Sequence, residues 1–117
     1  MSASIVLRKA KQVGRVMSRP IDKVIYDRAA ALVVNGWTQQ VYARNANGKA
    51  VSPLAKTAVQ FCAAGALRRA AFEVIGDKTE ALVFMVKVPD INDLIDFNES
   101  PDATPEAICE VFKARAQ

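Results

Sequence analysis

The chain has 117 residues, of which 51% are hydrophobic and 24% charged, a balance that is typical of a globular domain and excludes a disordered chain or a fibre. Its unbroken apolar stretches, such as residues 29–34 and 81–86, are far shorter than the ~20 residues that cross a bilayer. Basic residues directly follow Ile5, Val6 and Leu7, which leaves no apolar centre for a signal peptide. We therefore expect one soluble, cytoplasmic domain over residues 1–117 with no transmembrane segment.

The net charge of +4 conceals a gradient along the chain. Residues 1–23 carry six basic and one acidic side chains, residues 24–72 carry the same numbers, and residues 73–117 carry four basic and ten acidic ones. Such a chain can pair its oppositely charged parts internally, or it can offer a basic and an acidic face to different partners.

The first predicted element is a helix over residues 3–17, within a basic amphipathic segment that spans residues 1–19. Its apolar residues recur with helical spacing on one face, and four cations recur on the opposite face, namely Arg8, Lys11, Arg15 and Arg19. The cations have three interpretations: a solvated face, a contact for nucleic-acid phosphates, or a contact for an acidic protein or a membrane surface.

A second helix is predicted from Pro20 to Gly36, with the glycine in the left-handed conformation that follows many helices. Its expected inward face consists of Ile21, Ile25, Ala29 and Leu32. A short hairpin near residues 37–52 follows, because residues 37–44 alternate and residues 45–48 form an Asn-Ala-Asn-Gly turn before residues 49–52. Three side chains of this hairpin form a candidate contact for a ligand or partner, Trp37, Gln39 and Arg44, whose alternative role is to fill and cover the gap beside the helices.

The central helix is predicted to begin at Ser52 and Pro53 and to run to about Ala70. Its small residues 62–66 would let a neighbouring backbone approach closely. Cys62, inside this expected helix, is interpreted as a buried core cysteine, for which serine should be a worse replacement than alanine.

Residues 79–88 are compatible with a strand or a helix, and we favour a helix. Residues 90–103 are predicted to be a solvated acidic connection, because the acids that recur there lack the glycine and glutamate order of a calcium loop. Thr104 and Pro105 then open a last helix. The expected fold class is therefore mainly α, a compact bundle of about four to five helices with a short β-hairpin between the second and third, in which residues 20–117 form the helical core.

Two groups of residues resemble a family of small bacterial and phage proteins that carries only an unknown-function label. The first comprises Gly36-Trp37-Thr38-Gln39, Tyr42-Ala43-Arg44, Asn47-Gly48, Val51 and residues 61–67, and the second comprises Phe97-Asn98-Glu99 and residues 104–108. This chain has Gln40, Asn45 and Phe97 where the family pattern usually has glycine, aspartate and tryptophan. The resemblance implies a common fold and a bacterial or phage origin, but no mechanism.

No set of residues indicates catalysis. The chain has no histidine, the commonest general base and zinc ligand, and Cys62 and Cys109 are not spaced as metal ligands or as a disulfide framework. We expect a non-enzymatic accessory or regulatory protein without cofactor or metal, whose partner is another protein. The first alternative is a nucleic-acid-binding protein that uses the basic N-terminal helix. The second is a small-molecule binder or enzyme at the hairpin, and a homo-oligomer stays open.

Overall fold

The computed structural model describes residues 19–117. Its elements are, in chain order, helix α2 (Pro20–Asn35), strands β1 (Ala43–Arg44) and β2 (Gln60–Phe61), and helices α3 (Ala63–Ile75), α4 (Lys78–Val86), α5 (Ile91–Asn98) and α6 (Pro105–Arg115). The mainly α fold with a small antiparallel strand pair is therefore confirmed. The helix expected over residues 3–17 lies outside the described residues. No helix within residues 19–117 combines the length and the hydropathy needed to cross a membrane.

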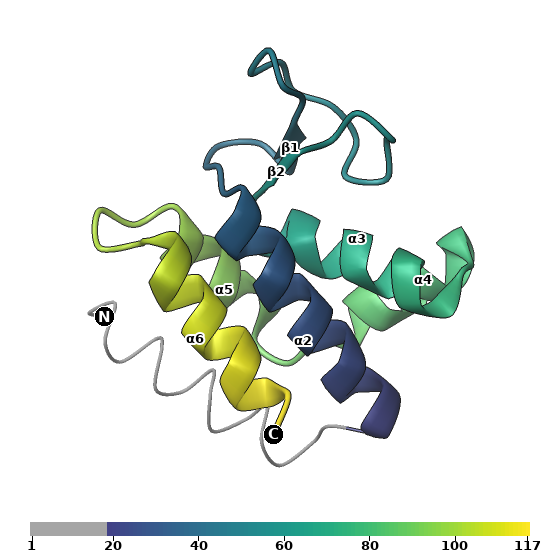
Figure 1. The fold of residues 1–117 in the computed structure, drawn as a ribbon. Helices are drawn as coiled ribbons and strands as arrows, with labels where there is room; N and C mark the ends of the chain where they lie inside the picture. The colour runs from purple at the N-terminus through teal and green to yellow at the C-terminus, as the bar shows by residue number, and fades with distance from the viewer. Residues whose placement is uncertain (1–18) are drawn as a thin grey trace.

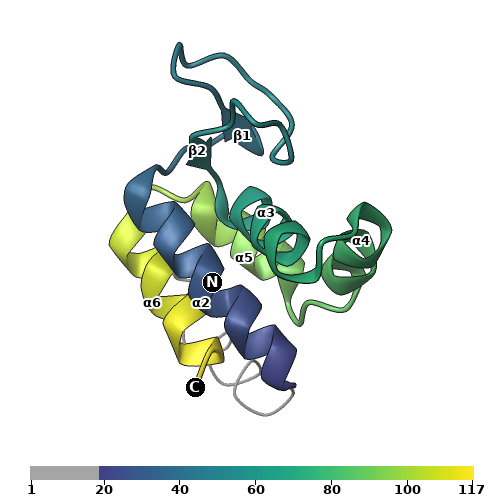
Figure 2. The ribbon, with the colours of Figure 1, turned by 45° about the vertical axis from the view of Figure 1, so that its right-hand side comes forward.

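Helix α2 is the central element, because it packs against both α3 and α6 (Figure 1). Helices α2 and α6 lie side by side and run in opposite directions in both views (Figures 1 and 2). With neighbours on two sides, α2 buries a wider stripe than the sequence predicted, made of Ile25, Tyr26, Ala29, Ala30 and Val33. The predicted face was correct at Ile25 and Ala29, but Ile21 is 42% exposed and Leu32 is only half-buried.

Gly36 follows α2, but the prediction of a left-handed glycine is wrong, because its φ of −175° is extended. The glycine is required for a different reason. A Cβ at this position would collide with the carbonyl oxygen of Val59, which runs alongside it. Gly36 therefore permits a close approach between the end of α2 and the segment that enters β2.

The predicted turn at residues 45–48 is present, with Asn45 Oδ1 accepting the amides of Asn47 and Lys49 at 3.0 Å each. However, the strand ladder joins β1 to β2, with Ala43 opposite Phe61. Because residues 60–61 are extended in this ladder, the central helix begins at Ala63, ten residues later than the sequence predicted at Pro53. Cys62 is buried, as predicted, but it does not lie inside the helix: it is the N-cap of α3.

The helix preferred over residues 79–88 is confirmed as α4, which Asp77 caps by accepting the Glu80 amide at 2.8 Å. The last helix is confirmed as α6, capped by Thr104. The acidic connection expected over residues 90–103 is wrong in its first part, which forms helix α5. Leu94 and Phe97, three positions apart, are buried on one face of α5, so tertiary packing stabilises a short helix that its acidic composition concealed.

Candidate functional site

Asn98, at the end of α5, is 1% exposed and connects three segments of the chain. Its Oδ1 accepts Trp37 Nε1 at 2.8 Å and the backbone amide of Ala63 at 2.9 Å. Its Nδ2 donates to Thr38 O at 3.3 Å and to Glu99 Oε2 at 2.8 Å. The side chain thus uses both oxygen lone pairs and both amide hydrogens, which fixes α5 to the start of α3 and to the segment after α2.

Two further hydrogen bonds strengthen this junction. Gln39 Nε2 donates to Asn98 O at 2.9 Å, and the Gln40 amide donates to Glu99 Oε1 at 2.8 Å. Gln40 has a φ of 76°, in the left-handed region that favours glycine, so the backbone accounts for the glycine of the family pattern at this position. The two groups of residues that carry the family resemblance therefore meet in space.

The structure brings the predicted hairpin residues Trp37, Gln39 and Arg44 into this corner, and each directs polar atoms at the chain itself. Arg44 Nε donates to Thr38 Oγ1 at 2.7 Å, and its two terminal nitrogens donate to Gln39 O at 3.2 Å and Gly48 O at 3.0 Å. This arrangement is similar to the alternative role considered for these residues, in which they fill and cover the gap beside the helices. The three side chains hold the hairpin segment against the helices.

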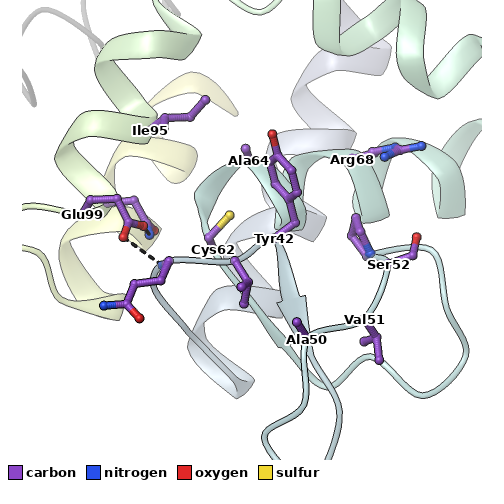
Figure 3. A pocket seen from close by; sticks show the side chains of 13 residues that line it. Tyr42, Ala50, Val51, Ser52, Cys62, Ala64, Arg68, Ile95 and Glu99 are labelled. Carbon is purple, nitrogen blue, oxygen red and sulfur yellow. Dashed lines mark hydrogen bonds between the residues drawn. The ribbon is translucent and has the colours of Figure 1, made fainter.

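A pocket of about 760 Å³ lies beside the junction, between the segment around Tyr42, the loop after the turn, the start of α3 and the end of α5 (Figure 3). Its apolar wall consists of Val41, Tyr42, Ala50, Val51, Pro53 and Ile95. Its polar lining includes Gln40, Ser52, Cys62, Arg68, Asn98 and Glu99. Tyr42 is 59% exposed, so the rim of the pocket carries an aromatic ring that the protein itself leaves uncovered.

Cys62 lines this pocket but does not have the properties of a nucleophile. Its Sγ accepts the Gly65 amide at 3.3 Å as the N-cap of α3. Burial raises the pKa of the Cys62 thiol, and the nearby Glu99 carboxylate adds to the rise, so the thiol stays protonated near neutral pH. The small residues at the start of α3 serve the predicted close approach, because a Cβ at Gly65 would collide with Tyr42 O.

The adjacent arginines Arg68 and Arg69 of α3 have different surroundings. Arg69 donates to Pro53 O at 3.0 Å and Ala55 O at 2.8 Å, which holds the loop that forms one wall of the pocket. Arg68 lines the pocket, and its buried Nε, like that of Arg69, has no hydrogen-bond acceptor among residues 19–117. Within residues 19–117, no ion pair involves Arg68.

The predicted basic row is only partly visible in this structure. Arg8, Lys11 and Arg15 lie outside the described residues. Arg19 is the N-cap residue of α2: its backbone amide donates to Asp22 Oδ2 at 3.1 Å, and its guanidinium pairs with Asp22 Oδ1 at 3.0 Å. Among the described residues, no group of three or more cysteine or acidic side chains is arranged to hold a metal ion.

The fold and the pocket define a small helical protein with an accessible pocket where its strand segment meets α3 and α5. The chain belongs to the family of unknown function DUF6197, whose model matches residues 17–117. No curated protein and no solved structure matches the chain significantly. The aromatic-Asn-acid motif of the sequence had singled out Asn98 and Glu99 as part of the family pattern, but it assigned no role to them. It gave no signal for Arg68 or Ile95, which reach the pocket only through the packing of α3 and α5.

Proposed function

We propose that this protein is a non-enzymatic accessory or regulatory protein that binds a segment of another protein in the pocket beside Asn98. The observation that carries the proposal is the pocket itself: about 760 Å³, lined by both apolar and polar residues. Apolar walls with a few oriented polar groups are the usual composition of a binding site. Peptide-binding grooves use the same combination for affinity and specificity.

The shape and lining of the pocket favour a protein segment over the other partner classes. The pocket is open to solvent, which lets a bound segment continue beyond it. The exposed ring of Tyr42 is the kind of residue that dominates binding energy at protein interfaces. Burial raises the pKa of the Cys62 thiol, so this lining residue does not support covalent catalysis.

The test begins with a photo-crosslinking amino acid, p-benzoylphenylalanine, at position 42 of the full chain in its native host. A matched chain carries it at position 113, on the exposed side of α6. A protein adduct that forms from position 42 and not from position 113 is identified by mass spectrometry. The purified partner is then titrated with the wild-type chain and with the Tyr42→Ala and Lys113→Ala variants.

We expect Tyr42→Ala to weaken binding at least about tenfold, as the loss of an aromatic anchor does, and Lys113→Ala to stay within about twofold. The proposal is overturned if no protein adduct depends on position 42, or if Tyr42→Ala binds the purified partner as tightly as the wild type. A nucleic-acid adduct in place of a protein adduct also overturns it, in favour of the alternative that uses Arg8, Lys11, Arg15 and Arg19.

A further inference from the structure

Arg68 is the one cation among the described residues that line the pocket. Both it and Arg69 are partly buried on α3, and the buried Nε of each lacks a hydrogen-bond acceptor among residues 19–117. Arg69 has other partners, namely two loop carbonyls, the Glu73 carboxylate at 3.5 Å and the Phe61 ring at 5.9 Å. Arg68 has no hydrogen bond or ion pair to residues 19–117, so its terminal nitrogens are available to an acceptor from outside the chain.

The charge around the pocket is uneven. Residues 37–68 supply most of its lining and carry four cations and no acidic side chain, and of these cations Lys49 and Lys56 are exposed. The acidic side is formed by α5, where Glu99 already accepts hydrogen bonds from the Gln40 amide and from Asn98 Nδ2. An incoming anionic group is therefore attracted to the Arg68 side, and nothing in the pocket lining there competes for the guanidinium.

We infer that the partner segment carries an acidic side chain next to an apolar one, and that Arg68 binds this carboxylate while Tyr42, Val51 and Pro53 receive the apolar neighbour. This inference rests on the proposed function and adds the chemistry of the segment. A guanidinium presents its donors in a planar fork that matches the two oxygens of a carboxylate. Arg68 and these apolar residues line the same pocket, so the two side chains of the segment must be close in sequence.

The test uses three synthetic tripeptides as probes in NMR titrations of the ¹⁵N-labelled full chain. The first is acetyl-Leu-Glu-Leu-amide, and the second is acetyl-Leu-Gln-Leu-amide, which has the same shape without the charge. The third, acetyl-Leu-Gln-Leu with a free C-terminal carboxylate, distinguishes a side-chain carboxylate from a chain terminus. The protein is used as wild type, as Arg68→Gln, as Arg68→Lys and as the control Lys113→Gln, which also loses one positive charge.

We expect the glutamate peptide to bind the wild type about tenfold more tightly than the glutamine peptide, as a charge-assisted hydrogen bond provides. Shifts should centre on the amides around Tyr42, Val51 and Arg68. The tenfold preference should fall below about twofold in Arg68→Gln, persist in part in Arg68→Lys, and persist fully in Lys113→Gln.

Three results would overturn the inference: equal binding of the first two peptides, an unchanged preference in Arg68→Gln, or no binding of any peptide at millimolar concentration. A preference for the free C-terminus would overturn the side-chain assignment. None of these results affects the outcome of the crosslinking at position 42. A protein partner whose binding depends on Tyr42 but not on Arg68 would therefore refute this inference without contradicting the proposed function.

Discussion

Replacement of Asn98 by alanine should destabilise the fold more than any other single polar substitution among the contacts described above. The change removes the acceptor for Trp37 Nε1 and for the Ala63 amide, and Ala63 is fully buried. An unsatisfied buried donor costs about 1–3 kcal/mol, with the smaller value for the half-buried indole, which water can reach. The lost side-chain contacts add to this, so we expect a decrease of about 3–5 kcal/mol in the free energy of unfolding.

The measurement is urea unfolding followed by circular dichroism, with the fluorescence of Trp37, the only tryptophan, as a second probe. Asn35→Ala is the matched control, because that exposed amide only donates to Ala31 O within its own helix, and its loss should change stability by less than about 0.5 kcal/mol. The cycle of Asn98→Ala with Trp37→Phe should give a coupling energy of about 1–2 kcal/mol. A loss below 1 kcal/mol for Asn98→Ala at an unchanged m-value would refute the view that Asn98 holds the three segments together.

Four further predictions concern residues around the pocket. Cys62→Ser should keep the N-cap acceptor and stay within about 0.5 kcal/mol of the wild type, whereas Cys62→Ala should cost about 1 kcal/mol in urea unfolding, the reverse of the order that the sequence suggested. Because burial raises the pKa of Cys62, a maleimide at pH 7 should label it much more slowly in the native chain than in denaturant, and equal rates would contradict the N-cap geometry. Gln40→Gly should raise the free energy of unfolding by about 0.5–1 kcal/mol, because glycine adopts the φ of 76° without strain. Gln39→Gly is the control and should lower the free energy of unfolding, because it removes a hydrogen bond to Asn98 O. A loss of stability in Gln40→Gly would contradict the left-handed backbone. Gly65→Ala should cost about 2 kcal/mol through its collision with Tyr42 O, although alanine is the better helix former, and a gain in melting temperature would disprove that approach.

The elements that the sequence predicted well are those whose ends are encoded locally. Pro20 and the pair Thr104-Pro105 begin α2 and α6 as predicted, since a helix start depends on a cap and a first turn that lie within a few residues. The turn at residues 45–48 is encoded in the same local way, by the Asn45 side chain and by Gly48 with its φ of 79°. Such features do not require knowledge of distant contacts.

The elements that the sequence missed depend on distant partners. Pairing of β1 with residues 60–61 is not encoded in either segment, and it moved the start of the central helix from Pro53 to Ala63. Helix α5 is short and acidic, and its stability comes from the burial of Leu94 and Phe97. The pocket depends on both of the features that the sequence did not predict. A helix through residues 53–62 would have removed its loop wall, and a solvated connection in place of α5 would have removed Ile95 and Glu99 from its lining.

The charge gradient along the chain is used for internal pairing, one of the two ways that the sequence left open. Among the described residues, Arg28 and Arg69 pair with Glu73 at 3.0 and 3.5 Å, so cations of the middle of the chain reach across α2 and α3 to an acid of its last part. Arg68 takes no part in this pairing, although it is next in sequence to Arg69. A guanidinium that binds an external carboxylate must lack an internal acceptor in the absence of its partner, and Arg68 meets this condition among residues 19–117. The position of this one cation in the lining of the pocket is therefore the feature that connects the charge distribution of the sequence with the proposed binding of an acidic segment.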